Sequence, residues 1–215
     1  MTIEHLTRIA ALGAVFAIAC MGANAKAVDS TDSVDNTRKE SKPPAASAPN
    51  KAGSTNDKTN RIEFENATLK MIVIPRTREQ MKAFYEGRGF SQKAIAAIAE
   101  ACFMTVIINN KTDDILWLEL DNWRFHSHAA DVTRLDRAFW NQRWKKLDVP
   151  MANRSTFGWT QLPERRDLQA GEGVGGNITM AFTEQPFELT AKFLRGADKQ
   201  ISPLSVHLQQ LQCIK

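Results

Sequence analysis

The chain has 215 residues, of which 28 are Lys or Arg and 24 are Asp or Glu, giving a formal net charge of +4. The two signs are interspersed and no basic run is interleaved with aromatic residues, which argues against a nucleic-acid-binding protein. Hydrophobic residues make up 43% of the chain, so we expect a folded domain with a core of its own.

The N-terminus is typical of an exported protein. Residues 9–20 are uncharged and apolar, which is too short for a transmembrane helix and suits the apolar region of a signal peptide. The small-x-small sequence at residues 23–25 provides a cleavage site and predicts a signal peptide over residues 1–25. Residues 17–20, Ala-Ile-Ala-Cys, resemble a lipobox, which would instead leave Cys20 lipidated. The two alternatives are a periplasmic protein and a lipoprotein anchored at the outer membrane.

Residues 26–60 differ sharply in composition from the rest of the chain. They hold almost no large apolar side chain and are rich in Ser, Asn, Asp, Lys and Pro. Such a segment cannot bury enough apolar surface to offset the entropy of ordering it, so we predict a disordered linker. Residues 61–215 remain as the folded domain. A linker of this kind suits a lipid-tethered protein, but an unanchored protein can carry one too, so both alternatives stay open.

Two cysteines, Cys102 and Cys213, lie in the predicted domain. In an oxidising compartment two otherwise lone cysteines most often bond to each other, which predicts a Cys102–Cys213 disulfide. The bond would close a loop of about 110 residues and contribute up to about 4–5 kcal/mol. Two buried thiols are the alternative.

The first half of the domain mixes strand and helix patterns. Residues 61–75 combine apolar alternation with an apolar run and predict an opening strand. Residues 77–89 and 91–102 predict two short helices that form a helical hairpin, the first beginning with a capping box at Thr77. Residues 103–120 hold two β-rich runs around the turn residues NNKTDD, which predicts a β-hairpin.

The second half is predicted to be mostly β. Residues 136–150 place Trp140 and Trp144 at helical spacing and predict one further helix. From residue 155 onward, short strand patterns alternate with polar turns. The predicted fold class is therefore mainly β, an immunoglobulin-like β-sandwich with an inserted helical hairpin and one further helix. The sequence LQAGEGVGGNITMAF followed by PFELTAKFLRG, residues 168–196, resembles the late strands of immunoglobulin-like accessory domains in bacterial envelope proteins. The resemblance implies a fold and no activity.

Sequence motifs give little support for catalysis. Gly171, Gly173 and Gly176 match Gly-x-Gly-x-x-Gly, but a polar stretch precedes them and the strand-like NITMAF follows. A dinucleotide site needs a buried strand before the motif and a helix after it, so we predict a turn. The sequence contains no Gly-x-Ser-x-Gly elbow and no His-Glu-x-x-His pair. We expect a protein that is not an enzyme.

Two histidines provide an alternative function. His126 and His128 are two residues apart, and on a strand both imidazoles would point to one face, as two ligands of a Cu or Zn ion would. Exposed loop histidines without a metal are the plainer interpretation. A periplasmic metal carrier is therefore the alternative, and otherwise we expect no cofactor.

Tryptophans are frequent for a domain of this size. We expect Trp117 to lie in the core, whereas Trp123 and Trp140 are the candidates for exposed aromatic faces. Residues 121–131 combine aromatic, cationic and adaptable side chains, as the most strongly contributing residues of interfaces do. The candidate binding residues are Trp123, Arg124, His126, His128 and Trp140.

Together these patterns predict a non-catalytic exported envelope protein that binds a macromolecular partner. The partner is an envelope protein or peptidoglycan, and the role is that of an accessory, assembly or immunity factor. We expect no nucleic acid as a partner, and contact with a membrane only through a lipid on Cys20.

Overall fold

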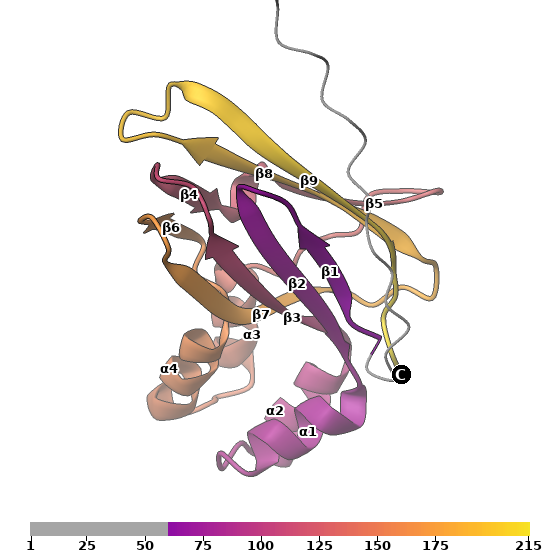
Figure 1. Cartoon of the computed structure of the whole chain (residues 1–215). Coiled ribbons are helices and arrows are strands. Elements are labelled where there is room, and N and C mark those ends of the chain that lie inside the picture. The colour runs from indigo at the N-terminus through magenta and orange to yellow at the C-terminus, as the bar shows by residue number, and fades with distance from the viewer. Residues whose placement is uncertain (1–59) are drawn as a thin grey trace, which may run out of the picture. The chain divides into compact units, whose positions relative to one another are not determined.

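The computed structural model describes residues 60–215, which form two β-sheets and four α-helices (Figure 1). The predicted signal peptide (1–25), Cys20 and all but the last residue of the predicted linker (26–60) lie outside the described residues. These assignments therefore stay predictions. No helix in the described part is both long and apolar enough to cross a bilayer.

Both sheets are antiparallel. The first has the strand order β1-β2-β3-β7, and its strands are β1 (Ile62–Glu65), β2 (Leu69–Arg76), β3 (Ala101–Asn110) and β7 (Gly173–Ala181). The second has the order β5-β8-β4-β6, with β9 also paired to β8. Its strands are β4 (Leu116–Glu119), β5 (Trp123–Ser127), β6 (Arg165–Leu168), β8 (Phe187–Arg195) and β9 (Ile201–Leu211).

The main core lies between the two sheets. In β2, β3 and β8, apolar residues at every second position point to it. Met104 and Val106 do so from β3, and Leu189 and Phe193 do so from β8, all of them fully buried. The arrangement is that of a sandwich, as the alternating patterns predict.

The four helices lie against the other face of the first sheet (Figure 1). A second apolar cluster is buried between them and that sheet. The helices are α1 (Arg78–Glu86), α2 (Gln92–Ala99), α3 (Arg137–Lys146) and α4 (Met151–Thr160). Phe103 reaches this cluster from β3 because it alternates with core-facing neighbours, and its ring lies 6.4 Å from that of Trp140. The described residues thus form three layers, with the helices against the first sheet and the first sheet against the second.

The predicted helical hairpin and the helix in residues 136–150 are both present. α1 begins with the predicted capping box, since Thr77 Oγ1 accepts from the Gln80 N–H and Gln80 Oε1 accepts from the Thr77 N–H, both at 3.1 Å. α2 ends at Ala99, earlier than predicted, because the chain enters β3 at Ala101.

The predicted fold class needs correction, since the fold is a mixed α/β sandwich with four helices and not a mainly β one. Residues 155–162, predicted as a strand, mostly belong to α4. The opening strand is in fact two strands, β1 and β2, because the Asn66 side chain accepts from the backbone N–H groups of Thr68 and Leu69 and turns the chain back. The immunoglobulin-like topology itself remains a prediction.

The hairpin predicted for residues 103–120 is wrong. β3 pairs with β2 and β7 in the first sheet, whereas β4 pairs with β6 and β8 in the second. The turn residues between them instead carry the chain from one sheet to the other. The buried Asn110 side chain stabilises this crossing by donating to the carbonyls of Asp114 and Leu168, at 2.8 and 3.0 Å.

The glycine motif is a turn only at its start. Gly171 has φ +75°, while Gly173 and Gly176 lie within β7. A Cβ on Gly176 would come within 2.4 Å of the Leu162 backbone nitrogen, so the glycine allows the chain after α4 to pass close to β7.

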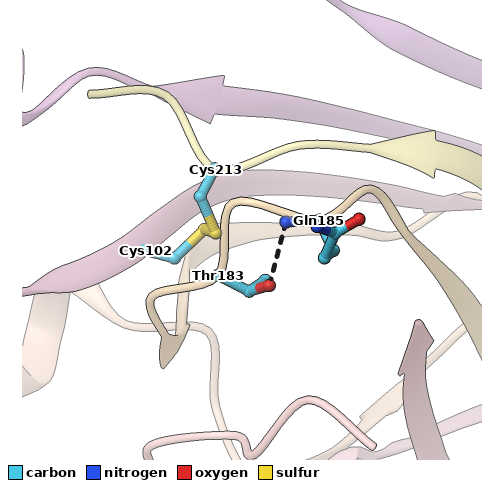
Figure 2. The surroundings of a disulfide bond; sticks show 4 residues. All are labelled: Cys102, Thr183, Gln185 and Cys213. Carbon is cyan, nitrogen blue, oxygen red and sulfur yellow. Dashed lines mark hydrogen bonds between the residues drawn. A yellow bond between two sulfur atoms is a disulfide. The ribbon is translucent and has the colours of Figure 1, made fainter. Parts of the chain in front are cut away.

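The predicted disulfide is confirmed. Cys213, which follows β9, is bonded to Cys102 on β3, with the two Cα atoms 5.3 Å apart (Figure 2). The bond joins the C-terminal segment, which follows the last strand of the second sheet, to the N-terminal end of β3, an inner strand of the first sheet. Beside it, the Gln185 N–H donates to Thr183 Oγ1 at 3.1 Å in the β7–β8 connection (Figure 2). Because structural disulfides persist in oxidising compartments, the bond indicates an extracytoplasmic protein.

Candidate functional site

Trp123 is not on the surface, contrary to our prediction. Its side chain is 3% exposed and its ring packs edge-on against Phe193, with the centroids 5.7 Å apart. The reason is the alternation of β5, which buries Trp123, Phe125 and Ser127 and exposes the residues between them. In the predicted binding segment, residues 121–131, Arg124 is exposed, but the aromatic side chain beside it in sequence, Trp123, is buried and cannot contact a partner.

Trp140 is buried as well, so this prediction is also wrong. It is 3% exposed, its indole stacks on Trp144 with the centroids 4.8 Å apart, and its N–H donates to Thr179 Oγ1 at 2.7 Å. Trp117, expected in the core, is only half-buried. Its N–H donates to the Gly196 carbonyl at 2.7 Å, and the Lys199 ammonium lies 4.4 Å from its ring centre.

The two histidines are exposed, and their surroundings supply little for a metal. His126 Nδ1 lies 2.9 Å from Asp131 Oδ1, while His128 lies beyond the end of β5. The third histidine of residues 60–215, His207, lies on β9 and is hydrogen-bonded to Thr190 at 3.1 Å. Within residues 60–215, no three His, Cys, Asp or Glu side chains are placed to hold one ion.

A cavity of about 450 Å³ lies between α3, α4 and β7. Its walls include the buried aromatic residues Trp140, Trp144 and Phe157. Two large apolar side chains on α4 also line it yet face solvent, since Met151 is 71% and Trp159 is 90% exposed. The cavity thus has an aromatic interior and an exposed apolar rim.

The local sequence explains this geometry. Asp136 caps the N-terminus of α3, since its side chain accepts from the Phe139 N–H at 2.8 Å. Pro150 precedes α4, and its carbonyl accepts from the Arg154 N–H at 3.0 Å. On α4, Met151, Ser155 and Trp159 are spaced at i, i+4 and i+8, so all three lie along the side that lines the cavity.

Partly buried hydrogen bonds hold the C-terminal end of α4. The Tyr85 hydroxyl is 2.7 Å from Thr160 Oγ1 and accepts from the Gln161 side-chain amide at 3.2 Å. Burial raises the pKa of Tyr85 to about 12, so this hydroxyl stays protonated near neutral pH. The aromatic wall of the cavity is therefore fixed against α1.

Cationic groups predominate around the cavity. Arg134 is neutralised by Glu164 at 2.7 Å. In contrast, Arg137, Lys145 and Arg154 have no carboxylate within salt-bridge distance in residues 60–215. The residues lining the cavity include four cations and two carboxylates, a net charge of +2.

The arrangement can bind an apolar group next to negative charge. Sequence analysis missed its rim because Met151 and Trp159 lie at the ends of a helix that we had interpreted in part as a strand. Their spacing with Ser155 was the available signal. It was weak because Gly158 and the β-branched Thr156 and Thr160 disfavour a helix in the same stretch.

Comparisons with known proteins assign no family. No protein-family model matches the sequence, and no curated protein matches it. Among solved structures, a "putative lipoprotein" of Bacillus subtilis, YcdA, is similar with a TM-score of 0.36 and 10% sequence identity. The similarity covers 69% of this chain and 38% of that one. The fold and the cavity define this protein as a helix-covered β-sandwich with a cavity lined by aromatic residues.

Proposed function

We propose that this chain is a non-catalytic exported envelope protein that binds a partner protein in the cavity between α3 and α4. The observation that carries the proposal is the exposed Trp159 and Met151 beside an aromatic cavity of about 450 Å³. Large apolar side chains gathered at one place on a surface mark an interaction site. Tryptophan and arginine are the residues that contribute most to binding at such sites.

A partner protein fits better than peptidoglycan. Trp159 offers an exposed aromatic face on which a glycan stacks, but the exposed apolar Met151 and the cavity lined by Trp140 and Trp144 suit an apolar side chain of a protein better than a sugar. A protein partner can insert one side chain into the cavity and cover Trp159 and Met151 with the surface around that side chain.

The extracytoplasmic setting supports the proposed location. We place the protein in the periplasm, with anchoring at the outer membrane through Cys20 as the alternative. The role is that of an accessory, assembly or immunity factor built on an immunoglobulin-like sandwich. The proposal requires no cofactor and no nucleic acid.

Affinity capture tests this function. The full chain, immobilised, is incubated with envelope extract, and the retained protein is identified by mass spectrometry, purified and rebound. Trp159→Ala should weaken rebinding by about thirtyfold, which corresponds to the 2 kcal/mol typical of a major interface residue. Because Trp159 is 90% exposed, the substitution removes almost no internal packing, and the melting temperature should not change.

Ile201→Ala is the matched control. Ile201 is also a large exposed hydrophobic residue, at 39%, but it lies on β9 and does not line the cavity. Its substitution should leave rebinding unchanged. Equal binding by the wild type and the Trp159 variant would refute the proposed site.

A further inference from the structure

We infer that the segment bound in this cavity is an acidic stretch of the partner, which inserts one apolar side chain between α3 and α4 and sets its carboxylates against the cations that line the cavity, Arg137, Lys145 and Arg154. The inference rests on the proposed function, because it specifies the chemistry of the partner at that same site. Three features of the cavity lead to it: its unpaired cations, their spacing and its aromatic interior.

The carboxylates that line the cavity have partners within the protein, whereas most of its cations do not. Glu164 accepts from both Arg134 Nη1, at 2.7 Å, and the Arg137 backbone N–H, at 3.2 Å. Asp136 is occupied as the helix cap of α3. The carboxylates of the lining are therefore already used within the protein, whereas the side chains of Arg137 and Lys145 have no ionic partner in the described part of the chain. An arriving carboxylate would be attracted and an arriving ammonium repelled.

Arg154 adds a third cation from the opposite helix. It is half-buried, and its Nε–H donates to the Val149 carbonyl at 2.7 Å, which fixes the stem of the side chain. No carboxylate in residues 60–215 reaches its guanidinium. A partly buried, pre-positioned guanidinium is well suited to bind a carboxylate.

The spacing of these cations favours a polypeptide over a single anionic headgroup. Arg137 and Lys145 are eight residues apart on α3, so their Cα atoms are separated by about 12 Å along the helix axis. One headgroup concentrates its charge over a few ångströms, so it matches two cations at this spacing less well than carboxylates spread along a chain do. A peptide with several Asp or Glu residues can do so, because about four extended residues span that distance.

The interior of the cavity selects an apolar side chain. It is walled by Trp140, Trp144 and Phe157, and its volume of about 450 Å³ lies within the range of pockets that enclose apolar groups. The class of partner segment is thus an aromatic or long aliphatic residue flanked by carboxylates.

Selection from a random peptide library displayed on phage tests the inference. The immobilised full chain should enrich sequences with one large apolar residue and at least two nearby Asp or Glu residues. The double variant Arg137→Glu with Lys145→Glu should bind the selected peptides at least about tenfold more weakly, since it sets like charges against them. The matched control, Lys93→Glu with Lys192→Glu, reverses two exposed lysines away from the cavity and should leave the affinity unchanged.

The outcomes separate the inference from the proposed function. Three results would overturn the inference: the enriched peptides lack acidic residues, no peptide is enriched, or both double variants lose affinity equally. A titration with dodecanoate identifies the lipid alternative: saturable 1:1 binding that is lost in Trp159→Ala, together with no peptide enrichment, would make the ligand an anionic amphiphile. If the inference fails while partner capture still depends on Trp159, the proposed function stands; if capture is independent of Trp159, the function fails.

Discussion

Removing the disulfide should cost this protein a large part of its stability. Cys102 and Cys213 are 111 residues apart in sequence, and the chain-entropy model assigns about 5 kcal/mol to a crosslink that closes a loop of this length. Typical domains have only about 5–15 kcal/mol in total. The variant Cys102→Ala with Cys213→Ala should therefore unfold at a much lower urea concentration, and on this estimate it can be partly unfolded at 37 °C. Urea unfolding followed by tryptophan fluorescence measures the change.

Chemical reduction provides the control for this prediction. Wild-type protein treated with a reductant should approach the stability of the double variant, whereas the reductant should not affect the variant itself. Cys102 is 3% exposed, so replacing it by Ala also removes buried sulfur contacts and lowers the free energy of unfolding on that account. Reduction leaves the sulfur atoms in place and therefore isolates the effect of the bond. A loss below about 1 kcal/mol in both experiments would refute the view that the bond stabilises the fold by restricting the unfolded chain.

Two further predictions concern stability. Gly176→Ala should destabilise the fold by about 1–3 kcal/mol, because its Cβ would collide with the Leu162 backbone. Gly158→Ala should instead stabilise the fold by up to about 1 kcal/mol, because a Cβ at this position of α4 meets open space. Thermal melting of both variants checks the order of their stabilities. Hydrogen bonds from Lys111 and Lys70 lower the pKa of Glu65 from 4.5 to about 2. The associated stability is present above pH 4.5 and is lost as the pH falls toward 2, so Glu65→Gln should make the urea midpoint less dependent on pH across this window. A Glu65→Gln profile parallel to that of the wild type would contradict the assignment.

The sequence identified the sandwich but not the route of the chain through it. Val106 and Leu116 are both core-facing, and inward alternation looks the same whether two strands pair in one sheet or face each other from two sheets. Only the long-range pairing of β3 with β7 and of β4 with β8 decides between them, and periodicity carries no such information. The disulfide, in contrast, followed from cysteine count and compartment alone.

The binding site was harder to predict than the fold. Trp123 alternates with the apolar Phe125, and this pattern already indicated an inward-facing ring. Trp140 and Trp144 form an i, i+4 pair, which also indicates a buried helix face. The prediction chose Trp123 and Trp140 because tryptophans are frequent, and it did not take account of the strand and helix periodicity that indicates their burial. Trp159 could be found only once α4 was known to be a helix.

Site-specific photocrosslinking tests the central claim most directly, namely that the cavity between α3 and α4 receives a partner protein. A photoreactive phenylalanine analogue replaces Trp159 in the full chain within producing cells, and in a second strain it replaces Lys192, an exposed residue on β8 that does not line the cavity. We expect a discrete crosslinked adduct with another protein from position 159 and none from position 192. Adducts of equal yield at both positions, or none at position 159 while position 192 crosslinks, would contradict the account.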